Sequence, residues 1–162
     1  MIDVNISMAI GSTDEEAEIV NEACKKRDLR PIISRNYGRK GAVDYLPTLV
    51  ILSIGAIASG LLGELGKDVY EKLKEAIKEI YEKLRKTNNI NPDLRIYIDG
   101  KNEDGLVINI PMESKSAMII SLERLPEEVK NKKLSGGIYF NAKIKEWGTY
   151  EDIEKWRKKG QI

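Results

Sequence analysis

The stretch YLPTLVILSIGAIASGLLG, residues 45–63, contains no charged side chain and is followed by Glu64. Its portion TLVILSI, residues 48–54, is rich in β-branched residues, which is typical of a strand buried in the middle of a sheet. Gly55 would then make the turn, and the small residues after it would let a helix lie close against the sheet. We therefore expect a buried strand followed by a helix, or a single buried core helix, in this segment.

The same stretch allows a second interpretation, because its length is close to the roughly 20 apolar residues that cross a bilayer. A proline, a threonine, two serines and three glycines make it only moderately apolar. Small residues recur in it at four-residue steps, as they do where membrane helices pack closely: Gly55, Ser59 and Gly63, and also Ala56 and Gly60. The sequence thus leaves open that the protein is anchored or inserted in a membrane through residues 46–63.

The residues before this stretch predict a β-α-β beginning. Apolar and polar residues alternate from 2 to 10, which is the period of a strand with one buried face. Thr13 and Glu16 have the spacing of a helix capping box, and an apolar stripe continues to about Arg27. Cys24 belongs to that stripe and should pack as a small apolar residue. Residues 30–35 then predict a second short strand.

The residues after the stretch predict a long amphipathic helix. Apolar residues recur at three- and four-residue steps from Val69 to Leu84, and acids and bases alternate on the opposite face. The pattern stops near Lys86, before a pair of asparagines and a proline. We expect the helix to end there.

The C-terminal half is rich in predicted strands. Alternating residues at 94–98 and 106–110 flank a polar, glycine-bounded loop and indicate a β-hairpin, whereas 117–122 fits a strand or a helix start equally well. Pro126 is placed to begin a short helix, because proline suits a first helical turn. A last strand is expected over 138–144, followed by a short helix capped by Thr149.

Together these elements predict a single α+β domain over residues 1–162, with a mixed or mostly antiparallel sheet of about five strands packed against two main helices. It would comprise a βαβ-like start at 1–44, the apolar segment with the long helix at 45–87, and a strand-rich half with short helices at 92–162.

The composition excludes several kinds of site. The 162 residues include no His and a single Cys, which removes His ligands, His-based triads, an intramolecular disulfide and CxxC sites. With 27 basic and 26 acidic residues the net charge is +1, which does not indicate a nucleic-acid-binding surface. Asp99, Glu103 and Asp104 lack the spacing of a calcium loop. We find no catalytic constellation, metal site or cofactor motif, and this favours a protein that is not an enzyme.

One loop could nevertheless bind an anion. Arg35, Arg39 and Lys40 surround Tyr37, and such a basic, aromatic loop could hold a phosphate or a nucleotide. Its simpler interpretation is a solvated connection between elements. We keep a phosphate- or nucleotide-ligand binder as an alternative function.

The function that we favour is a non-catalytic protein-interaction or self-assembly module, with another protein or a second copy as partner. Aromatic residues, which are enriched at interfaces, gather near the C-terminus at Tyr139, Trp147, Tyr150 and Trp156, although closing the core explains them better. The candidate packing surface comprises Gly55, Ser59, Gly60, Gly63, Trp147 and Trp156. The N-terminus lacks the pattern of a secretory signal, so we expect a cytoplasmic protein, or else a membrane-associated one. The abundance of Lys and Glu is typical of a thermophile.

Overall fold

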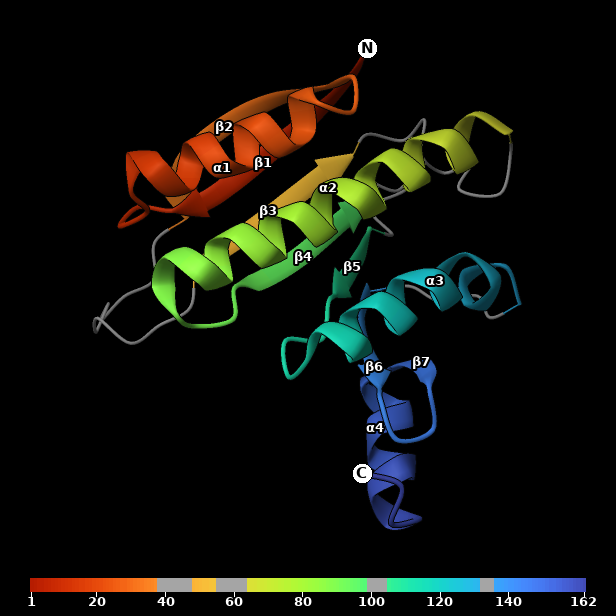
Figure 1. Cartoon of the computed structure of the whole chain (residues 1–162). Helices are drawn as coiled ribbons and strands as arrows, with labels where there is room; N and C mark the ends of the chain where they lie inside the picture. Colours follow the sequence, from red (N-terminus) through yellow and green to blue (C-terminus); the bar gives the residue numbers. More distant parts are fainter. Residues whose placement is uncertain (38–47, 55–63, 99–104, 132–135) are drawn as a thin grey trace.

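Seven strands form one continuous sheet in the computed structural model, which describes residues 1–37, 48–54, 64–98, 105–131 and 136–162 (Figure 1). The strands are ordered β2-β1-β3-β4-β5-β6-β7 across the sheet. In chain order the elements are β1 (Ile2–Ala9), α1 (Asp14–Lys25), β2 (Leu29–Tyr37), β3 (Leu49–Ile54), α2 (Glu64–Asn88), β4 (Asp93–Ile98), β5 (Leu106–Asn109), α3 (Lys115–Asn131), β6 (Gly136–Asn141), β7 (Glu146–Thr149) and α4 (Tyr150–Lys158).

The sheet is built from three successive β-α-β units. In each unit a helix connects two neighbouring parallel strands, which are β1 and β2, β3 and β4, and β5 and β6. The junctions between units, and the final pair β6 and β7, are antiparallel. The predicted α+β class and mixed sheet are therefore confirmed, whereas the strand number is larger than expected and half of the pairings are parallel.

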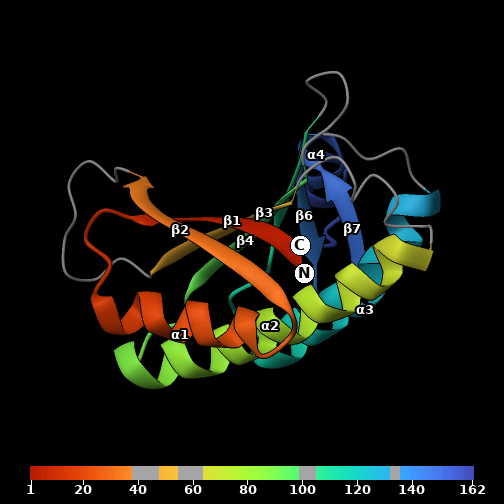
Figure 2. The same ribbon diagram turned by 90° about the horizontal axis from the view of Figure 1, so that it is seen from above.

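The helices α1, α2 and α3 lie next to one another along one face of the sheet (Figure 2). α4 packs against the opposite face at β7, where a Cβ atom on Gly148 would lie 2.5 Å from the ring of Trp156. Trp147 is adjacent in the strand and points the other way, donating a 2.8 Å hydrogen bond from its indole nitrogen to the carbonyl of Ser121 in α3. The C-terminal edge of the sheet is thus covered on both faces.

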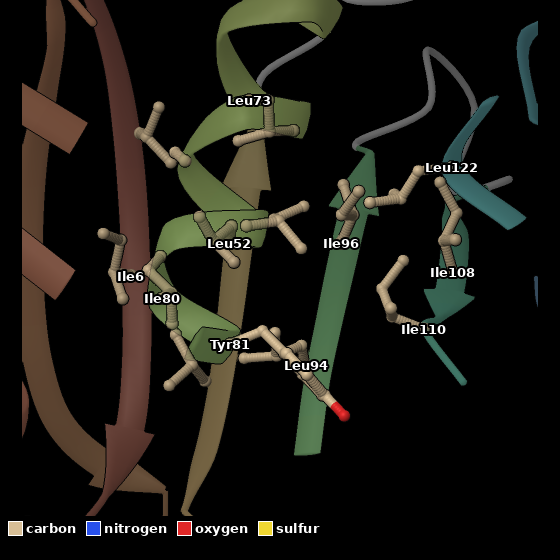
Figure 3. Packing of buried hydrophobic residues seen from close by; sticks show 14 of the residues in the cluster. Ile6, Leu52, Leu73, Ile80, Tyr81, Leu94, Ile96, Ile108, Ile110 and Leu122 are labelled. Atoms are coloured by element: carbon tan, nitrogen blue, oxygen red, sulfur yellow. The ribbon is translucent and has the colours of Figure 1, made fainter. Parts of the chain in front are cut away.

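The core lies between the sheet and the helices (Figure 3). Alternate strand residues such as Ile6, Leu52 and Ile96 are almost completely buried, and they face the apolar stripe of α2 that includes Leu73 and Ile80. Burying each side chain of this size contributes about 1.5–3 kcal/mol. The amphipathic pattern that predicts α2 is therefore the pattern that attaches it to the sheet.

The uncharged stretch begins as the expected buried strand. β3 lies in the sheet between β1 and β4, with Val50 and Leu52 fully buried. Residues 55–63, including the small-residue pattern, lie outside the described ranges. No helix in the described part of the chain is long and apolar enough to cross a membrane.

Two predictions in the C-terminal half are wrong. Pro126 does not begin a helix but lies inside α3, which also settles residues 117–122 as helix. The helix starts at Lys115, just after Ser114, whose hydroxyl oxygen accepts a 3.0 Å hydrogen bond from the amide of Ala117. An N-cap serine therefore replaces proline as the start signal.

The strand expected over 138–144 ends earlier, because a turn follows β6. The side-chain oxygen of Asn141 accepts hydrogen bonds from the amides of Lys143 at 3.0 Å and Ile144 at 3.4 Å. Lys145 then has a φ of +58°, and β7 returns antiparallel to β6. An asparagine that bonds the backbone two residues ahead is a local turn signal strong enough to interrupt the alternating pattern.

Candidate binding site on the outer face of the sheet

The outer face of the sheet is the face opposite α1, α2 and α3. Because side chains alternate along each strand, residues that pair across the sheet share a face. The strand register places one outer-face residue from each of six neighbouring strands in a single row: Ser34, Ser7, Ile51, Arg95, Asn109 and Tyr139. Side chains from six different strands thereby lie in one row on the same face.

One end of this row opens into a hollow of about 740 Å³, at the sheet end where β4 begins, β5 ends and β6 runs alongside. We call it the β4–β5–β6 hollow. Its apolar lining consists of Ile90, Ile110, Pro111, Met112, Tyr139 and Phe140. Its polar lining consists of Asn91, Asp93, Arg95, Asn109 and Glu113.

The charged groups of β4 that line the hollow are paired with each other. The guanidinium of Arg95 donates to the carboxylate of Asp93 through Nε at 3.2 Å and Nη2 at 3.0 Å. Their side chains are only 33% and 15% exposed. A two-point contact of this kind holds both groups in one orientation and leaves the pair with no net charge.

The rim of the hollow is held by Asn91. Its amide group donates a 2.5 Å hydrogen bond to the carbonyl of Met112, and its oxygen accepts a 3.2 Å bond from the hydroxyl of Tyr81 in α2. The segment before β4 is thereby joined both to the segment after β5 and to the helix layer. Asn109 adds a 3.1 Å bond from its side chain to the carbonyl of Ile138 in β6. The walls of the hollow are formed before any ligand arrives.

Three of the described lining residues are more exposed than the others. Tyr139 is 40% exposed and Ile90 is 39% exposed, so both present apolar surface at the same hollow. Glu113 is exposed and forms no hydrogen bond or ion pair with any described residue. The arrangement is thus an apolar and aromatic surface beside one free carboxylate.

The predicted phosphate-binding loop is described only at its start. Arg35 in β2 makes a 2.6 Å ion pair with Asp14, and a shallow hollow of about 410 Å³ contains both residues together with Glu18. Two carboxylates beside one guanidinium oppose the binding of a phosphate at this point. β2 ends at Tyr37, and Arg39 and Lys40 lie outside the described ranges.

The remaining predicted site residues are buried or lie in undescribed segments. Trp147 and Trp156 are buried, in agreement with the core role that the sequence favours for them, whereas Tyr139 and Tyr150 are exposed. Gly55, Ser59, Gly60 and Gly63 are outside the described ranges, as are Asp99, Glu103 and Asp104. No group of three potential metal ligands occurs among the residues that the structure describes. Association with a membrane and self-assembly stay predictions.

Most residues of the hollow were not predicted from the sequence as site residues. The alternation along 94–98 does place Arg95 opposite the buried Leu94 and Ile96, so its outward position is readable from the sequence. No local signal, however, indicates that β6 would pair with β5 and so bring Tyr139 and Phe140 beside the residues of β4 and β5. That neighbourhood depends on the crossover through α3.

Comparison with protein-family models finds no match for this chain. The curated proteins and the solved structures likewise contain none that matches it. The functional argument therefore depends on the geometry of the hollow itself.

Proposed function

We propose that this protein is a non-catalytic interaction domain that binds a short segment of another protein in the β4–β5–β6 hollow. The observation that carries the proposal is the accessible Tyr139 and Ile90 beside a preformed hollow of about 740 Å³. This volume lies within the range of about 300–1,000 Å³ that is usual for ligand sites. Exposed aromatic and aliphatic side chains next to a hollow are the usual anchors of a protein interface.

The state of the polar groups supports binding rather than catalysis. A general acid or base must be able to exchange a proton with a substrate. Asp93 and Arg95 are engaged with each other, and the amides of Asn91 and Asn109 hold backbone carbonyls. Glu113 could exchange a proton, but the other charged groups of the described lining are engaged and do not form an acid–base pair with it. The engaged side chains shape the site and keep it rigid, which lowers the entropy lost on binding.

A peptide-display selection tests the proposal. The baits are the wild-type chain, the double variant Ile90→Ala/Tyr139→Ala, and Tyr150→Ala as the matched control. Tyr150 is 67% exposed and does not line the hollow, so the control removes an exposed aromatic ring elsewhere. Thermal unfolding of all three proteins would verify that the substitutions leave the fold intact.

We expect related peptides to be enriched on the wild type and on Tyr150→Ala. Their affinity for the double variant should be lower by about tenfold or more, as for interface anchors in general. Two results would contradict the proposal: no convergence of the selected sequences, or equal affinity for the wild type and the double variant.

A further inference from the structure

We infer that the segment bound in the β4–β5–β6 hollow carries a lysine or arginine flanked by apolar residues. The inference rests on the proposed function and specifies the chemistry of the partner. Its basis is the combination of one unpaired carboxylate, one exposed aromatic ring and an apolar lining around a single preformed hollow.

The charge of the lining favours a cation. Asp93 and Arg95 neutralise each other, so the net charge of the lining residues that the structure describes is that of Glu113. A basic side chain would gain the attraction of this free carboxylate, whereas an acidic one would be repelled by it. An acid that approached Arg95 would compete with the carboxylate of Asp93, which already contacts the guanidinium at 3.2 Å and 3.0 Å. Electrostatic complementarity of this kind mainly determines which partner is selected.

The uncharged part of the lining suits the same side chains. Lysine and arginine have long aliphatic stems that lie along apolar surfaces while the charged end stays in water. Ile90 and Met112 offer such a surface, and the ring of Tyr139 offers a face to which a cation is attracted. Apolar neighbours in the bound segment would cover the rest of the lining.

Matched pentapeptides test the inference directly. The probes are acetyl-Ala-Leu-Xaa-Leu-Ala-amide with lysine, norleucine or glutamate at Xaa, so that length and apolar content stay nearly constant. Binding would be followed by NMR, through the Met112 methyl and the Asn109 side-chain amide. We expect the lysine peptide to bind about fivefold more tightly than the norleucine peptide, in line with an exposed charge pair. The glutamate peptide should bind more weakly than both.

Two variants identify the carboxylate responsible. Glu113→Gln should remove the preference for lysine over norleucine. Glu127→Gln makes the same change of charge on the exposed surface of α3, away from the hollow, and should retain that preference. The preference should also decrease as salt is raised from about 0.01 M to about 1 M, because the screening length falls from about 30 Å to about 3 Å.

The possible failures are distinguishable. Equal binding of lysine and norleucine peptides, tighter binding of the glutamate peptide, or an unchanged preference in Glu113→Gln would each overturn the inference while the proposed function stands. If no probe shifts the signals of Met112 and Asn109, and the display selection also fails to converge, both are overturned.

Discussion

The hydroxyl of Tyr70 in α2 donates a hydrogen bond to the carbonyl of Leu122 in α3. In an uninterrupted helix this carbonyl would accept from the amide of residue 126, but that residue is Pro126, which has no amide hydrogen. A tyrosine from the neighbouring helix therefore supplies the donor that the proline lacks. The contact is buried, and burial is the main reason why the pKa of the Tyr70 hydroxyl lies well above its ordinary value. The pair explains how a helix can continue through a proline that the sequence marks as a start.

Replacing Tyr70 with Phe should lower the free energy of unfolding by about 1–3 kcal/mol, because a buried carbonyl then loses its donor. The loss should be smaller in a Pro126→Ala background, since an alanine has a backbone amide that can donate to the carbonyl of Leu122. Urea denaturation of the four proteins of this double-mutant cycle measures the difference. An equal loss in both backgrounds would show that the tyrosine does not act through this carbonyl.

Glu79 in α2 forms a charged cluster with the residues that follow α1. Lys26, Lys83 and Arg27 lie within 2.9, 2.9 and 2.7 Å of its carboxylate oxygens, and these hydrogen bonds lower its pKa to about 2. Because the folded-state pKa is below the ordinary 4.5, the stabilisation is complete above pH 4.5 and is lost as the pH falls toward 2.

We therefore expect Glu79→Gln to be less stable than the wild type at neutral pH, by about 1 kcal/mol for a partly exposed cluster. The difference between the two proteins should diminish from about pH 4.5 downward. Denaturation curves at several pH values test this. The comparison must be made between the two proteins, because the pKa values of Asp3, Glu75, Glu82 and Asp152 are also lowered. A difference that is independent of pH would contradict the assignment.

The buried side chain of Glu16 forms hydrogen bonds that link α1 to the start of β3 and the end of α2. Besides accepting from the amide of Thr13 at 2.8 Å, its carboxylate accepts from the hydroxyl of Thr48 at 2.5 Å and from the side chain of Asn88 at 2.6 Å. Only 7% of the residue is exposed. The capping box of α1 therefore also holds the residue before β3 and the end of α2.

Glu16→Gln should destabilise the protein by about 1–3 kcal/mol, although the side chain keeps its size. Each oxygen of Glu16 accepts a hydrogen bond, so an amide nitrogen in either position would face a donor. Asp152→Asn is the matched comparison, because Asp152 accepts from Thr149 in the capping box of α4, and its side chain is more exposed. We expect the Asn variant to lose less stability in thermal unfolding. Equal losses would indicate that Glu16 acts as an ordinary cap.

Gly148→Ala should displace α4 from the sheet. The added Cβ would lie 2.5 Å from the ring of Trp156 and 2.8 Å from the Cβ of Asp152, and overpacking of this kind costs about 1–3 kcal/mol. Gly11→Ala is the control, since nothing lies within 4 Å of its added Cβ. Tryptophan fluorescence and thermal unfolding would report the change around Trp156. Retention of the wild-type melting temperature would mean that α4 packs more loosely against β7 than the contact implies.

The hollow shows where local reasoning stops being sufficient. The outward position of Arg95 follows from alternation along its own strand, and Tyr139 is visible as one of the C-terminal aromatics. That these two residues lie in one row with Asn109 follows only from the register of β4, β5 and β6. The tertiary structure is also needed to show that Asp93 pairs with Arg95 and that Glu113 is free.

The sequence by itself determined the elements whose signals are local. The alternation in β1, the capping boxes at Thr13 and Thr149, the buried β3 and the apolar stripe of α2 all depend on spacings within one segment. Tertiary structure decided which strands became neighbours, because the backbone groups that pair strands are the same in every residue. It also decided the path of α3 through Pro126, because the donor for Leu122 comes from Tyr70, 52 residues away in the chain. The hollow is likewise decided by the tertiary structure, since the residues that line it come together only after the three β-α-β units have packed.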